Sequence, residues 1–345
     1  MTSTMRAWAV VAPGPIGSGV LRLSEKDVPT LRSHDVLVEV DVCGVCRTDL
    51  HVCEGDLPQK RPEVTPGHQV IGRVKAVGSE ASRFAIGERI GVAWLRSTCR
   101  ICDWCRDGRE NLCRSSTYTG WDEDGGFAEF TAVPEQFAYR LPAGYSDEEV
   151  APLLCAGIIG YRALKRARVP SAGRLGILGF GSSAHITLQI AIAQGVEVHV
   201  MTRGARNRDL ALEMGAASVG DAFDRATVPL DSAIIFAPNG DLLPRALECL
   251  RPGGTVALAG IHMSDIPVMS YTEHLFDERD VRSVTSNTRQ DGEELMRLAE
   301  RIPLDIRTTA YGFESLPQAL ADIKASRHAG SSVVRVSQAS GARNP

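Results

Sequence analysis

The stretch Arg174-Leu-Gly-Ile-Leu-Gly-Phe-Gly-Ser-Ser-Ala184 predicts a buried strand, a tight glycine turn and a following helix over 186–194. In the pattern Gly179-x-Gly181-x-x-Ala184, the glycines permit the turn and let backbone amides approach a pyrophosphate at the positive end of the helix. This pattern is weak by itself, so a glycine turn with a purely structural role is the alternative.

Around this motif, short apolar segments alternate with amphipathic ones. Strands are expected over 175–179, 196–201, 233–236, 255–259 and 281–285. Such alternation is the signature of a parallel sheet with helices on both faces. The segment that begins near Gly157 is therefore expected to be an α/β domain with a doubly wound parallel sheet.

The first 155 or so residues have a different texture, with short alternating runs interrupted by glycine and proline. Runs such as 36–42 and 70–77 predict strands of an irregular, mostly antiparallel domain. Near the C-terminus, a helix is expected over 291–301 and a last strand over 332–336. At 345 residues the chain exceeds the size of one hydrophobic core, which agrees with two domains.

Four cysteines lie close together in the first part of the chain. Cys99, Cys102, Cys105 and Cys113 have a spacing that lets one loop offer four sulfur atoms to a tetrahedral ion. Zinc held by four thiolates has no position left for substrate, so this site is expected to be structural. Disulfides or a chance cluster are the alternatives, but the two-residue gaps fit disulfides poorly.

A second set of metal-ligand types is scattered along the chain. Cys46 lies in Cys43-Gly-Val-Cys-Arg-Thr-Asp-Leu-His51, His68 in Thr65-Pro-Gly-His68, and Cys155 in Leu153-Leu-Cys-Ala-Gly157. Spacing alone does not select these three residues, but their contexts do. Two thiolates and one imidazole would leave one zinc position open for water or substrate.

These contexts, the four-cysteine loop and the glycine motif resemble the zinc-containing medium-chain alcohol dehydrogenases, in the order in which that family carries them. The resemblance covers nearly the whole chain. It implies a GroES-like domain over 1–156 and 289–345, which binds the catalytic zinc, and a Rossmann domain over 157–288. It also implies that Cys46, His68 and Cys155 bind the catalytic zinc, so that each chain holds two Zn²⁺ ions.

The resemblance also implies roles for the neighbours of Cys46. Thr48 and His51 correspond to the proton relay of the family, Asp49 to the carboxylate that orients the histidine ligand, and Arg47 to a residue that contacts the cofactor pyrophosphate. Gln69 stands where the family commonly has glutamate, which places ligand-exchange steps at the metal in doubt.

The end of the next strand bears on the choice of cofactor. An acidic residue there would bind the adenosine ribose and repel a 2′-phosphate. This chain has Thr202 instead, followed by Arg203, Arg206 and Arg208, which favours NADP over NAD. The alternative is that these arginines belong to a solvated helix start.

The predicted function is the interconversion of primary alcohols and aldehydes by hydride transfer to NAD(P). Trp94 would narrow the pocket in favour of small primary alcohols, and Trp121 either adds a wall or packs in the core. The alternative is a zinc-containing cinnamyl or aromatic alcohol dehydrogenase that acts mainly as an NADPH-dependent aldehyde reductase.

Composition excludes other classes. A net charge of -4 and a pI near 6.1 argue against a zinc-ribbon protein that binds nucleic acid. No apolar run approaches the length of a membrane span, and the start lacks a signal segment, so a cytoplasmic enzyme is expected.

A zinc-free quinone or enoyl reductase would need neither metal site. The resemblance suggests a homodimer or homotetramer.

Overall fold

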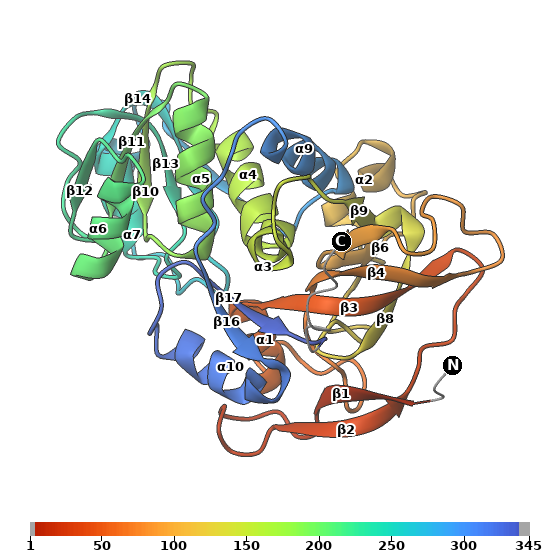
Figure 1. The fold of residues 1–345 in the computed structure, drawn as a ribbon. Helices are drawn as coiled ribbons and strands as arrows, with labels where there is room; N and C mark the ends of the chain where they lie inside the picture. The colour runs from red at the N-terminus through yellow and green to blue at the C-terminus, as the bar shows by residue number, and fades with distance from the viewer. Residues whose placement is uncertain (1–3, 338–345) are drawn as a thin grey trace. The chain divides into compact units, whose positions relative to one another are not determined.

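The computed structural model describes residues 4–337 of the chain. These residues divide into two units (Figure 1). The first comprises residues 4–155, 286–300 and 307–337, and the second comprises residues 156–285 and 301–306. The chain therefore passes between the units four times within the described part.

The first unit is built around one sheet whose strands follow the order β16-β17-β3-β4-β5-β9, with β8 also paired to β3. Apart from the parallel pair of β16 and β17, its strands pair antiparallel, as the sequence predicted. Two further pairs, β1 with β2 and β6 with β7, are also antiparallel. The strands are β1 (Thr4–Val10), β2 (Leu21–Asp27), β3 (Asp35–Val45), β4 (Gln69–Val77), β5 (Arg89–Val92), β6 (Leu95–Ser97), β7 (Thr117–Tyr118), β8 (Phe130–Pro134), β9 (Ala138–Arg140), β16 (Thr308–Gly312) and β17 (Ser331–Arg335).

Short helices complete the first unit. They are α1 (Arg47–Glu54), α2 (Asp103–Arg106), α3 (Asp147–Val150), α9 (Arg289–Ala299) and α10 (Leu316–Lys324), with 3₁₀ turns η1 (Glu110–Leu112), η2 (Glu135–Phe137), η3 (Ala151–Leu154) and η4 (Phe313–Ser315). The core lies around β3, which is almost wholly buried because β17, β4 and β8 all pair with it. Val36, Val38 and Val40 of this strand are part of the main apolar cluster.

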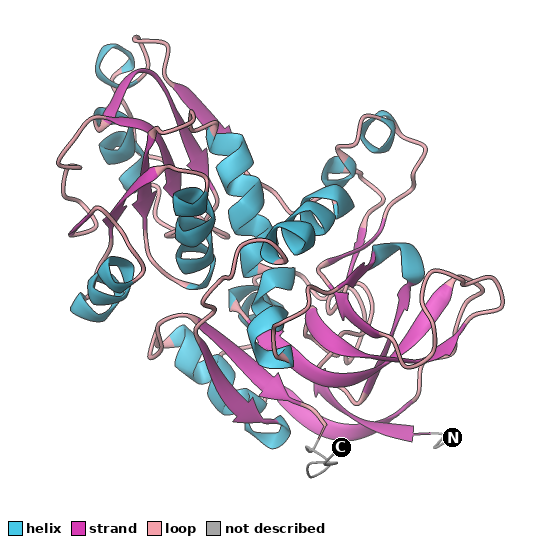
Figure 2. Cartoon of the chain, turned by 45° about the horizontal axis from the view of Figure 1, so that its top comes forward, coloured by secondary structure: helices cyan, strands magenta, loops and turns pink. Residues whose placement is uncertain are grey.

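The second unit has a parallel sheet of order β12-β11-β10-β13-β14-β15. Helices pack against its strands, as Figure 2 shows by the cyan helices beside the magenta strands. Its strands are β10 (Arg174–Leu178), β11 (Glu197–Met201), β12 (Ser218–Gly220), β13 (Leu230–Ile235), β14 (Leu250–Leu258) and β15 (Asp280–Ser283), and its helices are α4 (Ala156–Ala167), α5 (Ser182–Ala193), α6 (Ala205–Glu213), α7 (Leu242–Glu248) and α8 (Tyr271–His274). The predicted doubly wound parallel sheet is confirmed.

Several boundaries and one strand differ from the sequence-based expectation. Helix α5 begins at Ser182, four residues before the expected start, because Gly181 is its N-cap. Strand β12 was missed, since it is a short edge strand with no apolar run. Residues 301–306, expected in the first domain, group with the second unit. There the Gln189 side chain pairs with the backbone of Asp305, donating to its carbonyl at 2.9 Å and accepting from its N–H at 2.7 Å.

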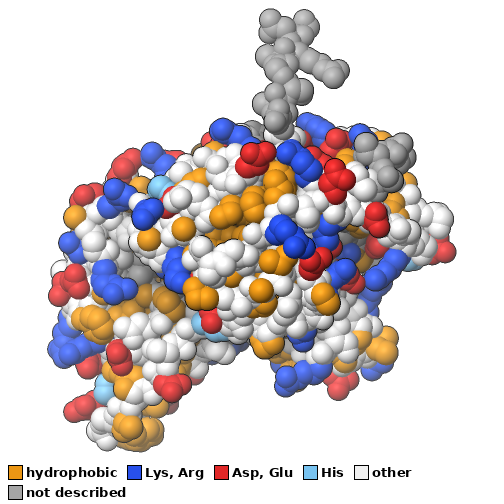
Figure 3. All heavy atoms as spheres, turned by 90° about the horizontal axis from the view of Figure 1, so that it is seen from below, with side chains coloured by type: hydrophobic (Ala, Val, Ile, Leu, Met, Phe, Trp, Pro, Cys, Tyr) orange, Lys and Arg blue, Asp and Glu red, His pale blue; other side chains and the backbone are white. Residues whose placement is uncertain are grey.

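Among residues 4–337, no helix combines the length and the apolar character that crossing a membrane would require. On the face seen in Figure 3, basic and acidic side chains are interspersed and no basic stripe is visible. This distribution agrees with the small net charge of -4.

Helices α4 and α5 approach each other closely at Gly160. A Cβ added there would lie 2.1 Å from Oγ1 of Thr187, so the contact requires glycine. We expect Gly160→Ala to lower the free energy of unfolding by about 1–3 kcal/mol, because overpacking forces the helices apart. Chemical denaturation of the purified protein measures this change.

The double variant Gly160→Ala/Thr187→Ala is the control, because it removes the side chain that the new methyl group meets. It should lose less stability than the sum of the two single variants. Wild-type stability in Gly160→Ala alone would contradict the close approach of the two helices.

Candidate functional site

Cys46, His68 and Cys155 meet in the first unit. Their ligand atoms all lie within 4.8 Å of one another, and Sγ of Cys46 is 3.5 Å from Nε2 of His68. The three residues come from different elements: Cys46 caps α1, His68 directly precedes β4, and Cys155 follows the turn η3. The structure thus brings together the set that the sequence contexts selected.

Helix α1 begins directly after Cys46, because Cys46 and Asp49 form a capping box at its N-terminus. The backbone N–H of Thr48 donates to Sγ of Cys46 at 3.3 Å, and the backbone N–H of Cys46 donates to the Asp49 carboxylate at 2.8 Å. Amides at a helix N-terminus favour the thiolate form of a cysteine, which is the form that binds metal. The capping of α1 therefore prepares Cys46 as a ligand.

The other oxygen of the Asp49 carboxylate orients His68. It accepts from Nδ1 of His68 at 3.1 Å and from the backbone N–H of Gly67, also at 3.1 Å. With the proton on Nδ1, Nε2 is the ring nitrogen left to bind a metal, and Nε2 is the atom that faces Cys46. Both Asp49 and His68 are almost fully buried.

Without a cation, protons would have to keep this cluster neutral. The hydrogen bond with Cys155 and burial raise the pKa of Cys46 well above its usual value. Burial by itself lowers the pKa of His68, but Asp49 and Cys46 raise it to about 10. A divalent cation replaces such protons on binding. Two sulfurs and one ring nitrogen are also the donors that zinc prefers, so these residues fit the ion.

The turn before His68 requires glycine. Gly67 has a φ of 98°, and a Cβ there would lie 2.8 Å from the backbone nitrogen of Phe127 and 2.9 Å from Sγ of Cys43. The buried Cys43 is thus a packing residue beneath the turn that presents His68.

Thr48 and His51 lie on α1 beside this cluster. Thr48 is 9% exposed and His51 is partly exposed. Nδ1 of His51 is 2.7 Å from a carboxylate oxygen of Asp56, which itself is exposed. The sequence analysis did not single out Asp56, although an acidic residue shortly after a relay histidine is a visible signal.

Lys26 is a second residue that the sequence analysis did not identify. Its ammonium donates to the Asp124 carboxylate and to Oγ1 of Thr65, both at 3.0 Å. Asp124 in turn accepts from the backbone N–H of Thr65 at 2.8 Å. These contacts hold the segment before His68 against β2, and nothing in local sequence indicates them.

Gln69, at the position where glutamate was expected, is buried against Gly44 of β3. A Cβ at Gly44 would meet the Gln69 side-chain oxygen at 2.7 Å. Within the described part of the chain, its side-chain nitrogen is buried without a hydrogen-bond partner.

Three aromatic side chains, Trp94, Tyr118 and Trp121, pack together next to His68. The Trp94 ring meets His68 edge-on, with centroids 4.9 Å apart, and stacks on Tyr118 at 5.0 Å and on Trp121 at 6.0 Å. The Trp121 indole N–H donates to the carbonyl of Pro58 at 2.9 Å. Tyr118 and Trp121 also contact each other, with centroids 5.9 Å apart, so the three rings form one aromatic cluster, and all three are partly exposed.

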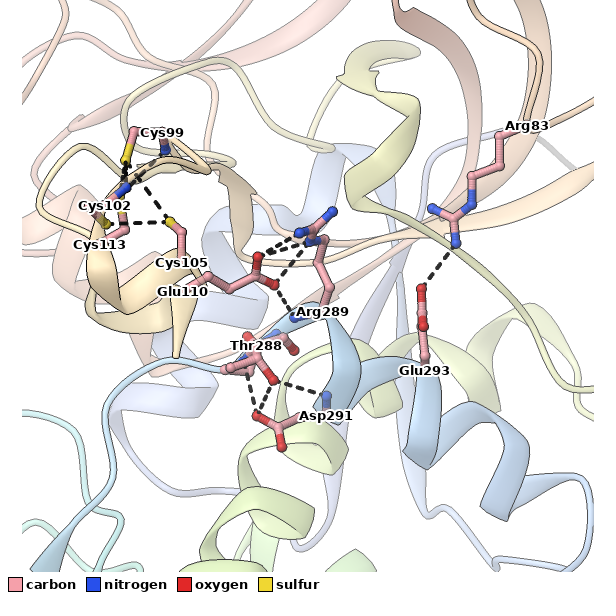
Figure 4. A network of polar contacts seen from close by, with 11 residues as sticks. Arg83, Cys99, Cys102, Cys105, Glu110, Cys113, Thr288, Arg289, Asp291 and Glu293 are labelled. Atoms are coloured by element: carbon pink, nitrogen blue, oxygen red, sulfur yellow. Dashed lines mark hydrogen bonds and ion pairs between the residues drawn. The ribbon is translucent and has the colours of Figure 1, made fainter. Parts of the chain in front are cut away.

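The four cysteines of the predicted structural site also converge. Figure 4 shows Cys99, Cys102, Cys105 and Cys113 with their sulfur atoms turned toward one another. The sulfur of Cys105 lies 3.6 Å from that of Cys102 and 4.0 Å from that of Cys99, which lies 3.5 Å from that of Cys113. Backbone N–H groups of Ile101 and Cys102 lower the pKa of Cys99 to about 6. Four sulfurs at this spacing fit a tetrahedral zinc ion.

The glycine turn lies in the second unit. Gly179 has a φ of 88° and its added Cβ would lie 2.8 Å from Ala237, whereas a Cβ at Gly181 would meet nothing within 4 Å. The open space at Gly181, the N-cap of α5, leaves backbone accessible to a ligand. Ala184 is fully buried in α5, and the side chain of His185 is buried with Nδ1 3.3 Å from the carbonyl of Gly181.

Thr202 follows β11 and its hydroxyl accepts from the backbone N–H of Phe180 at 3.1 Å, so it supports the glycine turn. Arg203 and Arg206 are exposed, whereas Arg208 donates to the Thr202 carbonyl at 3.1 Å. In the first unit, the exposed Arg47 donates to Oγ of Ser326 at 3.1 Å.

Comparisons with known proteins identify the family of this chain. Residues 32–143 match the alcohol dehydrogenase GroES-like domain family, and residues 184–301 match the zinc-binding dehydrogenase family. A protein of Mycobacterium tuberculosis described as probable alcohol dehydrogenase AdhA is 56% identical over 340 residues, which cover 97% of this chain and 98% of that protein.

Solved structures are similar over nearly the whole chain. A cinnamyl alcohol dehydrogenase of Sorghum bicolor is 26% identical with a TM-score of 0.87, over 96% of this chain and 97% of the other. A putative zinc-binding dehydrogenase of Sinorhizobium meliloti bound to NADP is 25% identical with a TM-score of 0.85, over 97% of this chain and 100% of the other. The chain therefore belongs to the zinc-containing medium-chain alcohol dehydrogenase family.

Proposed function

We propose that this protein is a zinc-dependent alcohol dehydrogenase that interconverts primary alcohols and aldehydes by hydride transfer to or from NAD(P). One observation carries the proposal. In a chain of this family, two cysteine sulfurs and a histidine nitrogen meet within 4.8 Å beside Thr48 and His51 on one helix.

Cys46, His68 and Cys155 would hold the catalytic zinc. Three protein ligands leave one position on the ion for a substrate oxygen, and the ion supplies the Lewis acidity that polarises this oxygen. Asp49 holds His68 in the tautomer that presents Nε2. The four-cysteine loop would hold a second zinc with a structural role, giving two zinc ions per chain.

Asp49→Asn tests the role of the carboxylate. The substitution weakens the hydrogen bond to Nδ1 of His68, so we expect the affinity of this site for zinc to fall about 10-fold to 100-fold. Metal analysis after dialysis against a weak chelator should find the loop zinc retained and the second zinc lost.

Asp56→Asn is the matched control, because Asp56 contacts a histidine of the same helix that is not a ligand. It should retain both ions. Full zinc retention in Asp49→Asn would contradict the assignment.

Thr48 and His51 would carry the hydroxyl proton toward solvent. The Thr48 hydroxyl can accept and donate, and it lies close to the cluster because its backbone is bound to Cys46. Asp56 engages Nδ1 of His51 at 2.7 Å and so orients its imidazole, a group that titrates near neutral pH in its unperturbed state. The partial exposure of His51 suits the outer end of a relay.

His51→Gln removes this titrating group and keeps a polar side chain of similar size. We expect kcat for alcohol oxidation near neutral pH to fall about 10-fold to 100-fold, at the lower end of what general acid–base groups contribute. Added imidazole should restore part of the rate, whereas zinc content should stay unchanged. An unaltered kcat would rule His51 out of the relay.

The cofactor would bind at the glycine turn, with Gly179, Gly181 and Ala184 admitting its pyrophosphate to the start of α5 and Arg47 adding a contact to it. We favour NADP because no acidic side chain follows β11. The Thr202 hydroxyl is directed to Phe180, and the exposed Arg203 and Arg206 could meet a 2′-phosphate. The NADP bound to the Sinorhizobium relative supports this preference.

The aromatic cluster of Trp94, Tyr118 and Trp121 would set the substrate class. Trp94 meets a ligand histidine edge-on and narrows the approach to it, which favours unbranched primary alcohols. The same aromatic cluster, together with the Sorghum relative, supports cinnamyl or aromatic alcohols as a second candidate class, with the enzyme acting as an NADPH-dependent aldehyde reductase.

A panel of alcohols and aldehydes tests the reaction, with cofactor absorbance as the readout. We expect turnover of primary or benzylic alcohols, a kcat/KM for NADP at least about tenfold above that for NAD, and loss of activity on chelation. Charge-assisted hydrogen bonds from two arginines to the 2′-phosphate would favour NADP over NAD by at least this factor. Activity that survives removal of all zinc would exclude the proposed mechanism.

We further propose that the chain forms a homo-oligomer through the edge of the parallel sheet. Strand β15 ends the sheet order and leaves one side unpaired among the described residues. Large apolar side chains are exposed nearby, namely Ile266, Val268, Tyr271, Phe276 and Val281. A second copy could cover both features by continuing the sheet across a two-fold axis.

Light scattering checks this assembly. We expect a mass of two or four times 37.1 kDa and its reduction by Val281→Asp, which places a charge at the proposed interface. Ile86→Asp, at an exposed apolar residue of the first unit, should leave the mass unchanged. A monomeric wild-type protein would contradict the proposal.

A further inference from the structure

The first turn of α9 is held by a carboxylate from the four-cysteine loop. Glu110 accepts from the backbone N–H of Arg289 at 2.8 Å and from its guanidinium at 2.7, 2.9 and 3.1 Å (Figure 4). The two residues are 179 positions apart in the chain. Glu110 therefore caps the N-terminus of a helix from outside that helix, where a negative charge is favoured.

The carboxylate of this pair is well shielded from solvent. Glu110 is 7% exposed, and the Arg289 guanidinium lies over the Phe137 ring at 4.7 Å. A forked arginine–carboxylate contact in such surroundings is stronger and more specific than an exposed ion pair. Elsewhere on α9, Glu293 makes a single contact with Arg83 at 3.3 Å, and the Glu293 side chain is 42% exposed.

Glu110 is also tied to the metal loop through its backbone. Its carbonyl accepts from the N–H of Cys113 at 3.0 Å, within the turn η1. The loop itself has little apolar core, because α2 between its cysteines buries none of its residues. The shape of the loop, and with it the place of Glu110, therefore depends on an ion held by the four sulfurs.

Helix α9 begins where the chain returns from the second unit to the first. The crossing lies between Thr285 and Ser286, and the capping box of Thr288 and Asp291 follows at once. Gly292 packs against the Tyr139 ring, which would lie 2.4 Å from an added Cβ. The start of α9 is thus held by the loop at Arg289 and by the sheet at Gly292.

We propose that Glu110 is a positioning residue that couples metal binding in the four-cysteine loop to the order of the first turn of α9, where the chain re-enters the first unit. This role rests on the loop zinc proposed above and is independent of the reaction. Coupling of this kind is reciprocal, so the contact with α9 also strengthens metal binding by the loop.

Hydrogen exchange and zinc release, neither of which requires turnover, test the coupling. Cys105→Ser removes one loop ligand, and Glu110→Gln removes the charge of the cap while the loop ligands stay. We expect each variant to speed exchange of the amides of residues 288–292 about tenfold, a typical coupling strength. The double variant should exchange no faster than Cys105→Ser alone, because both changes act through one contact.

Release of the loop zinc to a chromogenic chelator gives the reciprocal measurement. Glu110→Gln should release it about tenfold faster than wild type, and Arg289→Lys, which keeps the charge but loses the fork, should also release it faster. Glu293→Gln, the matched change on the same helix, should release it at the wild-type rate.

Two results would overturn the proposal. One is unchanged exchange at 288–292 in Cys105→Ser. The other is equally fast zinc release from Glu293→Gln and Glu110→Gln, which would mean that general loosening of α9 is responsible. Absence of dehydrogenase activity would refute the proposed function and leave both measurements valid.

Discussion

The buried carboxylate of Asp49 is the interaction on which the metal centre depends. One of its oxygens accepts from the backbone of Cys46 and the other from Gly67 and His68. It thereby joins the start of α1 to the turn before β4, two segments that are distant in sequence. A buried carboxylate is favourable only when its hydrogen bonds are made, so this residue and the two ligands stabilise one another.

The need to bring His68 to the Asp49 carboxylate explains the glycine at position 67 and the buried thiol of Cys43 beside it. His68 reaches the carboxylate only because Gly67 has a positive φ and lies against Cys43 and the backbone of Phe127. Cys155 reaches the cluster from the end of the first chain segment of the same unit, after the apolar turn η3. The first unit therefore supplies every candidate ligand, while the second supplies a glycine turn with open backbone at Gly181.

Much of this arrangement could be predicted from local sequence. The alternation after Gly157 indicated the parallel sheet, and the contexts of Cys46, His68 and Cys155 selected residues that the fold brings within 4.8 Å. Two features were not predicted. The edge strand β12 is short and has no apolar run, and the early start of α5 depends on its N-cap at Gly181. Contacts between residues far apart in the sequence, such as Glu110 with Arg289 and Lys26 with Asp124, could not be predicted either, because they form only in the folded chain.

Anomalous diffraction at the zinc absorption edge, on crystals of fully active enzyme, tests the central claim most directly. We expect a peak between the ligand atoms of Cys46, His68 and Cys155 and a second one amid the four loop sulfurs. Active crystals with density for the three side chains and no peak between them would contradict the account.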